Sequence, residues 1–253
     1  MVQAKFEKLS VFFPMWNEEQ YLQRALNAAQ ELCEELQKLQ TIAAYELVII
    51  DDASTDSTPQ LADAAAARDS HVKVVHHPVN RKLGGSIKSG FSASTGDIVL
   101  YTDADLPFDM REVRNAIRLM NQYEADIVSA YRFDRTGEGY VRVIYSMFYN
   151  LMVRVLFGVR FRDINFAFKL CRKSVFDQIE LESEGSFIDA ELIVSAKKLN
   201  MSVVQFGVDY FPRTRGVSTL SSPSVIIKIL REAFKLRKKL NAISPAERPG
   251  SSN

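Results

Sequence analysis

The stretch Asp97-Ile98-Val99-Leu100-Tyr101-Thr102-Asp103-Ala104-Asp105 decides how the chain is interpreted, because an apolar run leads directly into two carboxylates. Hydrophobic, β-branched runs of this length are typical of strands buried in a parallel sheet. Ligands of open α/β sheets bind beyond the carboxyl ends of such strands. Neighbouring acids at that position repel each other and favour a cation, and their oxygens suit Mg²⁺ or Mn²⁺. The alternative is a simple turn in which Asp caps the next helix.

The composition of the 253-residue chain is that of a globular protein, with 47% hydrophobic and 25% charged residues. The formal net charge of +1 argues against bulk electrostatic binding, so no nucleic acid partner is expected. Cys33 and Cys171 are too few for a disulfide framework and are expected to be buried free thiols. The first residues do not resemble a signal peptide, and no uncharged apolar stretch is long enough to span a membrane. A cytoplasmic location is therefore expected.

Segments with the pattern of strands alternate with segments of helical periodicity. Buried strands are expected at residues 9–13, 46–50, 72–76, 97–101, 126–130 and 203–208. Helices are expected after an N-cap at Asn17, from Pro59, from about Ser86 and over 111–122. Short connections between alternating strands and helices predict an α/β fold with a mostly parallel sheet flanked by helices.

Three polar features follow expected strands at what would be one edge of the sheet. Asp51-Asp52 could accept hydrogen bonds from a nucleobase and ribose hydroxyls. Lys82 with Gly84-Gly85 offers a cation and a close backbone approach at a helix start, which favours a phosphate. Asp103 and Asp105 offer the metal site. Together they predict a nucleoside diphosphate site with a divalent cation, whereas the lack of dinucleotide and P-loop glycine patterns disfavours NAD and ATP.

Four segments, in order, resemble the motifs of inverting family-two glycosyltransferases: PMWNE at 14–18, VIIDDASTD at 48–56, NRKLGG at 80–85 and TDAD at 102–105. The resemblance implies an A-type glycosyltransferase fold that binds a nucleotide sugar. The implied donor-binding residues are Pro14, Asn17, Glu18, Asp51, Asp52, Ser54, Lys82, Gly84, Asp103 and Ala104. Pro14, Glu18 and the acid pair at 51–52 would contact base and ribose. Asp103 and Asp105 would hold Mg²⁺ or Mn²⁺ against the diphosphate.

Segments of the second half resemble polyprenyl-phosphate glycosyltransferases, such as dolichyl-phosphate mannose and glucose synthases. DINFAFKL at 163–170 resembles the family's segment near the acceptor, with Ala167 where glycine is usual. RTRGVS at 213–218 resembles an Arg-x-x-Gly-x-Ser loop, in which Arg213 and Arg215 would neutralise charge on the departing diphosphate. The implied acceptor contacts are Arg132, Lys169 and Ser218.

Asp189 and Glu191 open an expected helix and resemble the family's Asp-x-Glu at the sugar-facing end of the site. A purely structural explanation also exists, since acids favour a helix N-terminus. The residues assigned to catalysis are Asp105, Asp189, Glu191, Arg213 and Arg215. Pro107 departs from the pattern, because many dolichyl-phosphate mannose synthases carry Gln there, so a metal contact from this position is lost.

Two segments have a basic amphipathic character. Residues 140–162 contain arginines, many apolar residues and no acid, which fits a helix at a membrane interface or a core helix. Residues 224–242 alternate cations with apolar residues, which fits a membrane-surface helix or a helix packed on the domain. The expected organisation is a catalytic domain over 1–223, a basic amphipathic helix over 224–242 and a disordered tail over 243–253.

The favoured hypothesis is metal-dependent, inverting transfer of a hexose from a donor of the GDP-mannose or UDP-glucose type to a polyprenyl or dolichyl monophosphate. The enzyme would lie on the cytoplasmic face of a membrane as a peripheral protein, and an integral-membrane partner subunit is plausible. One alternative is a soluble glycosyltransferase acting on a saccharide or protein hydroxyl, with Asp189 or Glu191 as the base. Another is a non-catalytic subunit that binds a nucleotide sugar.

Overall fold

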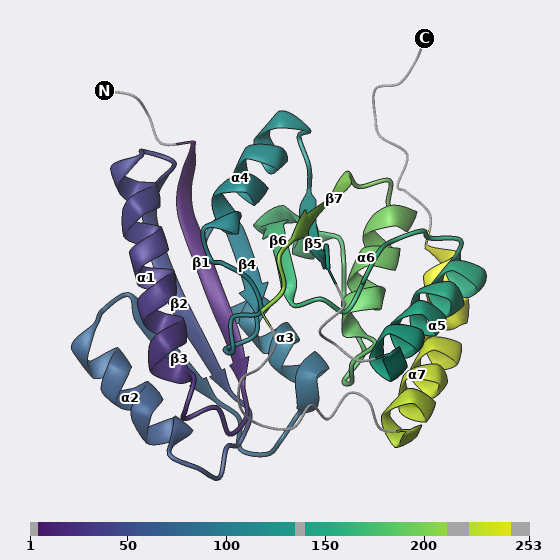
Figure 1. Ribbon diagram of the computed structural model, residues 1–253, viewed down its shortest axis with the longest axis horizontal. Coiled ribbons are helices and arrows are strands. Elements are labelled where there is room, and N and C mark those ends of the chain that lie inside the picture. Colours follow the sequence, from purple (N-terminus) through teal and green to yellow (C-terminus); the bar gives the residue numbers. More distant parts are fainter. Residues whose placement is uncertain (1–4, 135–139, 212–222, 244–253) are drawn as a thin grey trace.

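The computed structural model describes residues 5–134, 140–211 and 223–243 (Figure 1). One sheet of seven strands has the order β3-β2-β1-β4-β6-β5-β7. The strands are β1 (Phe6–Met15), β2 (Ile42–Asp51), β3 (Val72–His76), β4 (Ile98–Thr102), β5 (Ile127–Arg132), β6 (Phe168–Arg172) and β7 (Val203–Val208). The α-helices are α1 (Leu22–Lys38), α2 (Thr58–Arg68), α3 (Lys82–Ala93), α4 (Glu112–Gln122), α5 (Tyr140–Phe157), α6 (Ile188–Lys198) and α7 (Pro223–Ala242). The predicted α/β class with a mostly parallel sheet is confirmed.

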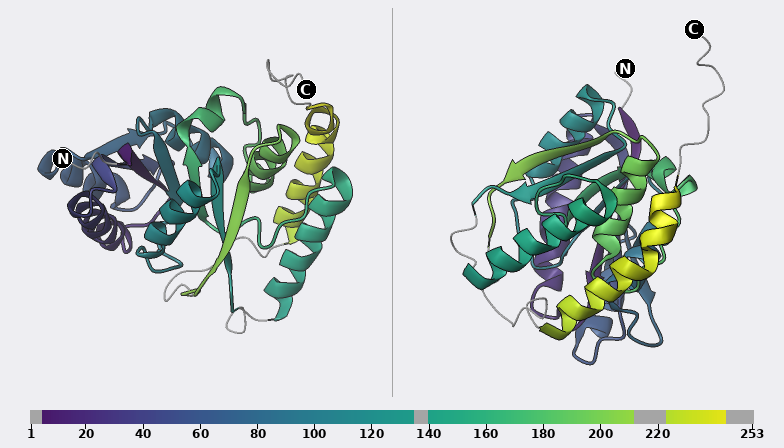
Figure 2. Two further views of the ribbon diagram at one scale, coloured as in Figure 1. Left: turned by 90° about the horizontal axis from the view of Figure 1, so that it is seen from above. Right: turned by 90° about the vertical axis from the view of Figure 1, so that its right-hand side faces the viewer.

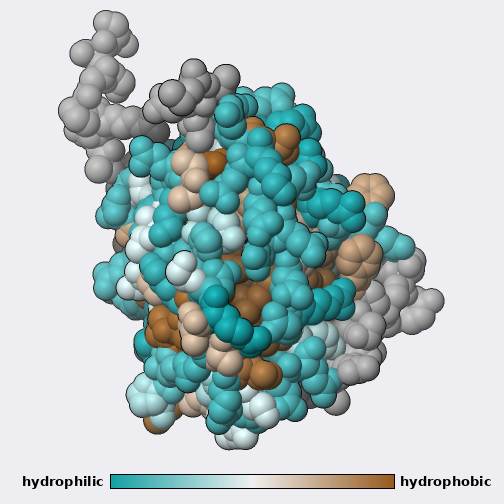
Figure 3. All heavy atoms as spheres, turned by 90° about the vertical axis from the view of Figure 1, so that its left-hand side faces the viewer, coloured by the Kyte–Doolittle hydropathy of each residue, from teal (hydrophilic) through white to brown (hydrophobic). Residues whose placement is uncertain are grey.

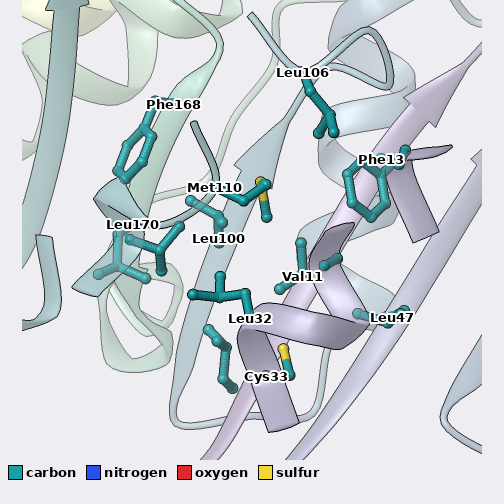
Figure 4. Packing of buried hydrophobic residues seen from close by; sticks show 14 of the residues in the cluster. Val11, Phe13, Leu32, Cys33, Leu47, Leu100, Leu106, Met110, Phe168 and Leu170 are labelled. Atoms are coloured by element: carbon teal, nitrogen blue, oxygen red, sulfur yellow. The ribbon is translucent and has the colours of Figure 1, made fainter. Parts of the chain in front are cut away.

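Helices cover both faces of the sheet, and each face has its own hydrophobic core. On one face α1, α2 and α4 pack against the strands, and Figure 4 shows the centre of this cluster, where Leu32 and Cys33 of α1 approach Val11, Leu47 and Leu100. On the other face α3 and α6 pack against the sheet, while α5 and α7 add a further layer. The right-hand view of Figure 2 shows α5 and α7 running side by side across this end of the molecule. Cys33 and Cys171 are buried and free, as predicted.

The strand that the sequence did not predict is β6, which lies between β4 and β5 and is antiparallel to both. All other neighbouring strands are parallel. β1 is longer at both ends than the strand expected over 9–13: it begins at Phe6, and Pro14 continues it beyond the residues paired with β4. A residue without an amide hydrogen is tolerated at that position, since no ladder bond to β4 is needed there.

The two basic amphipathic segments have different surfaces. The apolar side of α7 is buried in the core, through Ile229, Ala233, Leu236 and Leu240. Helix α5 instead exposes a row of large apolar side chains, which are Ile144, Met147, Phe148, Leu151 and Val155. The opposite end of the molecule, viewed in Figure 3, is mostly hydrophilic with small hydrophobic patches between. Within the described ranges, no helix combines the length and apolarity needed to cross a bilayer.

Candidate active site

The motif residues meet at one edge of the sheet because β1, β2 and β4 are parallel neighbours. In this register Met15 pairs with Asp51, and Phe12 pairs with Tyr101. The segments that follow the three strands therefore leave the sheet at the same edge. This is the position at which open α/β sheets bind ligands.

The first two motifs are tied together by hydrogen bonds between their loops. The Asn17 Oδ1 accepts from the Thr55 amide at 2.7 Å, and the Asn17 amide donates to the Ser54 Oγ at 3.0 Å. The Glu18 amide donates to the Thr58 Oγ1 at 2.9 Å. Asn17 is therefore not the helix cap that the sequence predicted, since α1 begins only at Leu22, with Tyr21 as its N-cap. Its side chain instead fixes the loop that follows β2.

Asp51 and Asp52 are buried, and each is paired with a histidine at the end of β3. The His76 Nδ1 lies 2.8 Å from the Asp51 Oδ2, and the Ser54 amide donates to the Asp51 Oδ1 at 3.1 Å. The His77 Nδ1 lies 2.7 Å from the Asp52 Oδ1, and the Arg81 amide donates to the same oxygen at 2.7 Å. The acid pair is thus held in a fixed orientation by the segments around it.

The third motif is arranged differently from the prediction, because α3 begins at Lys82 and not near Ser86. Lys82 is exposed at the start of this helix, where a cation can reach a phosphate. Gly84 faces the protein: its amide donates to the Glu184 carbonyl at 3.0 Å, and an added Cβ would lie 2.3 Å from the Ser183 carbonyl oxygen. Glycine at this position is needed for close packing of α3, and a phosphate contact from Gly84 stays a prediction.

The fourth motif places negative charge at the end of β4. Asp103 and Asp105 are partly exposed, and Ala104 between them is buried. The pKa of the buried Tyr101 hydroxyl is raised well above its ordinary value, first by burial and then by the charges of Asp189, Asp103 and Asp105. Three carboxylates therefore lie within electrostatic reach of one side chain.

This concentration of carboxylates fits a divalent cation. Hard oxygen ligands suit Mg²⁺ and Mn²⁺, which commonly complete their coordination with water and substrate phosphates. Within the described residues no group of three or more His, Cys, Asp or Glu is arranged to hold a metal on its own. That Asp103 and Asp105 hold a metal which also binds the donor diphosphate stays a prediction.

Asp189 lies in the first turn of α6 and is only 2% exposed. Its Oδ1 is 3.1 Å from the Nζ of Lys169, which is fully buried and also donates to the Phe166 carbonyl at 2.5 Å. Burial raises the pKa of Asp189, and Lys169 offsets only part of this effect. Lys169, predicted as an acceptor contact, thus lies inside the protein as the counter-ion of Asp189.

Glu191 has a structural environment. Its two carboxylate oxygens accept hydrogen bonds from the amides of Glu182 and Ser183, each at 2.8 Å. Burial raises the pKa of Glu191, while these amides act in the opposite direction. The side chain therefore anchors the segment on which Gly84 packs, and a catalytic role for it stays a prediction.

Arg132, another predicted acceptor contact, forms a bidentate ion pair with Asp163. Its Nε and Nη2 each donate to a different Asp163 oxygen at 2.6 Å, and its guanidinium lies over the rings of Phe166 and Tyr210. This arrangement fixes the beginning of the 163–170 segment. The remaining predicted residues, Arg213, Arg215 and Ser218, lie outside the described residues.

The sequence analysis missed His76, His77 and Asp163. A signal for the histidines existed, since they follow the apolar positions of β3 and so had to lie beside the acids that end β2. Asp163 was seen only as part of a motif, and no pattern indicated that it would pair with Arg132. The two histidines therefore hold the acids that end β2 through specific contacts, and Asp163 holds Arg132.

Comparisons with known proteins agree with this geometry. The family model described as Glycosyl transferase family 2 matches residues 10–180. Glycosyltransferase AglD of Haloferax volcanii is 28% identical over 211 residues, which are 81% of this chain and 33% of that protein. Undecaprenyl-phosphate 4-deoxy-4-formamido-L-arabinose transferases are similar too. The Sodalis glossinidius protein is 30% identical over 73% of this chain and 55% of its own length. The Pseudomonas aeruginosa (strain LESB58) protein is 33% identical over 67% of this chain and 48% of its own length. The chain thus spans between a third and about half of these relatives.

Solved structures share the fold. Glucosyl-3-phosphoglycerate synthase from Mycobacterium tuberculosis has a TM-score of 0.68 at 18% identity, covering 95% of this chain and 82% of that one. Mannosyltransferase PcManGT from Pyrobaculum calidifontis has a TM-score of 0.63 at 16% identity, and the match covers 96% of this chain and 70% of that one. The expected A-type glycosyltransferase fold is confirmed. The order of the motifs, their meeting at one sheet edge and the match over most of the chain show that this protein belongs to glycosyl transferase family 2.

Proposed function

We propose that this chain catalyses inverting transfer of a hexose from a nucleotide diphosphate sugar to a polyprenyl monophosphate. The observation that carries the proposal is the grouping of Asp103 and Asp105 with the acid pair Asp51-Asp52 at one sheet edge. Relatives that match most of the chain are named for transfer to undecaprenyl phosphate. Distant structural neighbours were crystallised with Mn²⁺ and UDP-glucose or GDP-mannose, which supports a donor of this class.

In this proposal, different residues of the site bind different parts of the donor. Asp51, Asp52 and Lys82 bind the nucleoside and phosphates, and Asp103 with Asp105 would hold the metal. A divalent cation there supplies charge that makes the diphosphate a better leaving group. The bond from the anomeric carbon to the donor phosphate breaks while an acceptor oxygen bonds to the opposite face of that carbon, which inverts its configuration.

A phosphate acceptor suits the state of Asp189. The second pKa of a phosphate monoester is near 6, so the acceptor is mostly a dianion at neutral pH and has no proton to lose. A sugar hydroxyl would need a base with access to it. Asp189 is almost fully buried and paired with Lys169, which favours an electrostatic role over proton abstraction.

A lipid acceptor also fits the end of the molecule formed by α5 and α7. The described part of α5 exposes five large apolar side chains, and α7 beside it exposes cations. The exposed cations of α7 are Lys228, Arg231, Lys235, Arg237, Lys238 and Lys239. Apolar side chains enter the headgroup boundary of a bilayer, and cations near an anionic leaflet each contribute about 1 kcal/mol. We therefore place this surface on the cytoplasmic face of a membrane, with or without an integral-membrane partner subunit.

A donor panel tests the proposed function. UDP-glucose and GDP-mannose are each incubated with Mn²⁺ and a polyprenyl phosphate in detergent, and the products are identified by mass spectrometry. Formation of a lipid-linked hexose is the expected result. Transfer only to a saccharide or protein hydroxyl would favour the alternative enzyme. Donor binding by calorimetry without release of sugar to any acceptor would indicate a non-catalytic subunit.

Asp189→Asn separates the two acceptor classes in the same assay. We expect a loss of turnover of at most about tenfold with a phosphate acceptor, because no proton is transferred. A loss of about a thousandfold with unchanged donor affinity would instead identify Asp189 as a base for a hydroxyl acceptor. Circular dichroism and urea unfolding confirm that the variant is folded, since it leaves Lys169 without its counter-ion.

A further inference from the structure

His76 connects the donor-binding edge to helix α2. It is the last residue of β3 and pairs in register with Asp51, the last residue of β2. Its Nδ1 lies 2.8 Å from the Asp51 Oδ2, and its Nε2 lies 3.1 Å from the Asp63 Oδ1 on α2. The imidazole thus bridges a buried carboxylate of the proposed site and an exposed carboxylate outside it.

This bridge requires the charged form of the ring. An imidazolium donates from both nitrogens, whereas a neutral imidazole carries one N–H and one lone pair. Ionised carboxylates only accept hydrogen bonds. A neutral His76 can therefore donate a hydrogen bond to Asp51 or to Asp63, but not to both. Its other nitrogen then presents a lone pair to a carboxylate oxygen, and the two repel each other.

The orientation of Asp51 depends on this contact. The Ser54 amide holds one oxygen and His76 holds the other. Each carboxylate oxygen can accept a second hydrogen bond, so Asp51 can still receive an N–H or O–H group of a ligand. Fixing the carboxylate before the ligand arrives removes an entropy cost from binding.

We propose that His76 is a positioning residue for the donor nucleotide, and that its protonated bridge between Asp51 and Asp63 makes donor affinity depend on pH. The inference rests on the proposed function, since it takes Asp51 to contact the nucleoside of the donor. It assigns to His76 no contact with the reacting atoms. Donor affinity is highest while the bridge is protonated and falls when the ring loses its proton.

Electrostatics support the direction of this effect. The pKa of His76 is raised above its ordinary value of 6.5, mainly by the hydrogen bond to Asp51, although desolvation acts against it, and Asp63 adds to the rise. In the described structure Asp51 on β2 and Asp63 on α2 are the charged groups that face the ring. The ring is protonated below this raised pKa, so the contribution of the bridge to donor affinity is complete there and is lost as the pH rises through that value.

Calorimetry on the full chain tests the proposal, with UDP-glucose and GDP-mannose as probes in the presence of Mn²⁺, from about pH 6 to about pH 9. These sugar diphosphates lack a terminal phosphate monoester, so they have no second ionisation near pH 6. For the unmodified protein the Kd of the donor that binds should rise about tenfold over this range. In turnover assays the KM for the donor should rise in the same way, while kcat changes much less.

The variants identify the group responsible. His76→Asn keeps an N–H donor near the Nδ1 position but carries no charge and does not titrate, so its Kd should not change between the two ends of the pH range. Asp63→Asn should move the rise in Kd to lower pH, because one of the acids that hold the proton is gone. His71→Asn is the matched control: His71 pairs with Asp69 just before β3 and should leave the profile unchanged.

The outcomes are distinguishable. A Kd that does not depend on pH, or an unchanged rise in His76→Asn, would overturn the role of His76 while leaving the proposed function intact. Failure of both nucleotide sugars to bind at any pH would overturn the proposed function and this inference with it.

Discussion

Two buried carboxylates, Glu46 in the first half of the chain and Asp189 in the second, have opposite electrostatic environments. Glu46 on β2 is 1% exposed, and its oxygens accept from Lys8, Lys73, Ser10 and Thr95. Burial acts to raise its pKa, but these hydrogen bonds outweigh burial and lower it. Asp189 on α6 is equally buried, yet Lys169 is its one charged partner within hydrogen-bond range in the described structure, and its pKa is raised.

The difference shows that the partners of a buried acid, more than its burial, determine its state. Glu46 joins β1, β2 and β3 through donors that satisfy it fully, which suits a structural role. Asp189 is incompletely compensated, and its charge acts on the Tyr101 hydroxyl, as do the charges of Asp103 and Asp105. Incompletely compensated acids are typical of functional sites. Glu46 thus ties together strands of the first half, whereas Asp189 adds negative charge beside Tyr101.

The largest effect is expected at Asp103 and Asp105, the acids proposed to bind the metal. Asp105→Asn keeps the size of the side chain and removes its charge, so turnover should fall by about a thousandfold. Chelation of divalent ions should have a similar effect on the unmodified protein. Asp109→Asn is the control, because Asp109 is partly exposed and paired with Arg111. An Asp105→Asn variant with nearly full activity would contradict the assignment.

The next effect concerns the stability of the second half. Lys169→Met should lower the free energy of unfolding at neutral pH by about 3–5 kcal/mol, because Asp189 is left as an unpaired buried charge. The loss should shrink as the pH falls, because a buried acid with a raised pKa takes up a proton and becomes neutral. Urea unfolding at several pH values measures this. The double variant Lys169→Met with Asp189→Leu should recover most of the loss, and a double variant as unstable as the single one would refute the pairing.

A smaller and opposite pH effect is expected in the first half. Because the folded pKa of Glu46 is lowered, its contribution is complete above the ordinary value of 4.5 and is lost as the pH falls through the lower value. Glu46→Gln should cost about 2 kcal/mol at neutral pH, since Lys8 and Lys73 remain partly solvated. The deficit should narrow in acid, where the unmodified protein loses the same contacts. A constant deficit between neutral pH and strong acid would mean that Glu46 is not the group that titrates.

The smallest effect is expected at the exposed row of α5. Phe148→Gln should weaken binding to vesicles containing anionic lipid about threefold to tenfold, because one large apolar side chain no longer enters the headgroup region. Tyr123→Gln is the matched control, since Tyr123 is an aromatic residue of similar exposure at the end of α4, 55% against 65% for Phe148. Sedimentation with vesicles measures both. Equal binding by the two variants would show that α5 does not contact the membrane.

The first half of the fold was predictable because each strand is an apolar run and each helix has a regular stripe. The motif acids could also be placed, since the ends of parallel strands share an edge. The antiparallel β6 was not predicted, because its buried lysine looks like a ligand-binding residue until the structure shows Asp189 beside it. Asn17 illustrates another limit. Its residue type is typical of a helix cap, but its side chain accepts a hydrogen bond from Thr55, and the local sequence does not indicate such a distant partner.

The position of β6 has a consequence for synthesis on the ribosome. Strands β1 to β4 are complete at Thr102, but the neighbour that covers the outer edge of β4 is β6, which ends at Arg172. At about 5–20 residues per second, the nascent chain carries this unpaired edge for several seconds. Open strand edges invite pairing with other chains. Truncated chains that end between β4 and β6 should therefore associate with one another or with chaperones far more than the complete chain does.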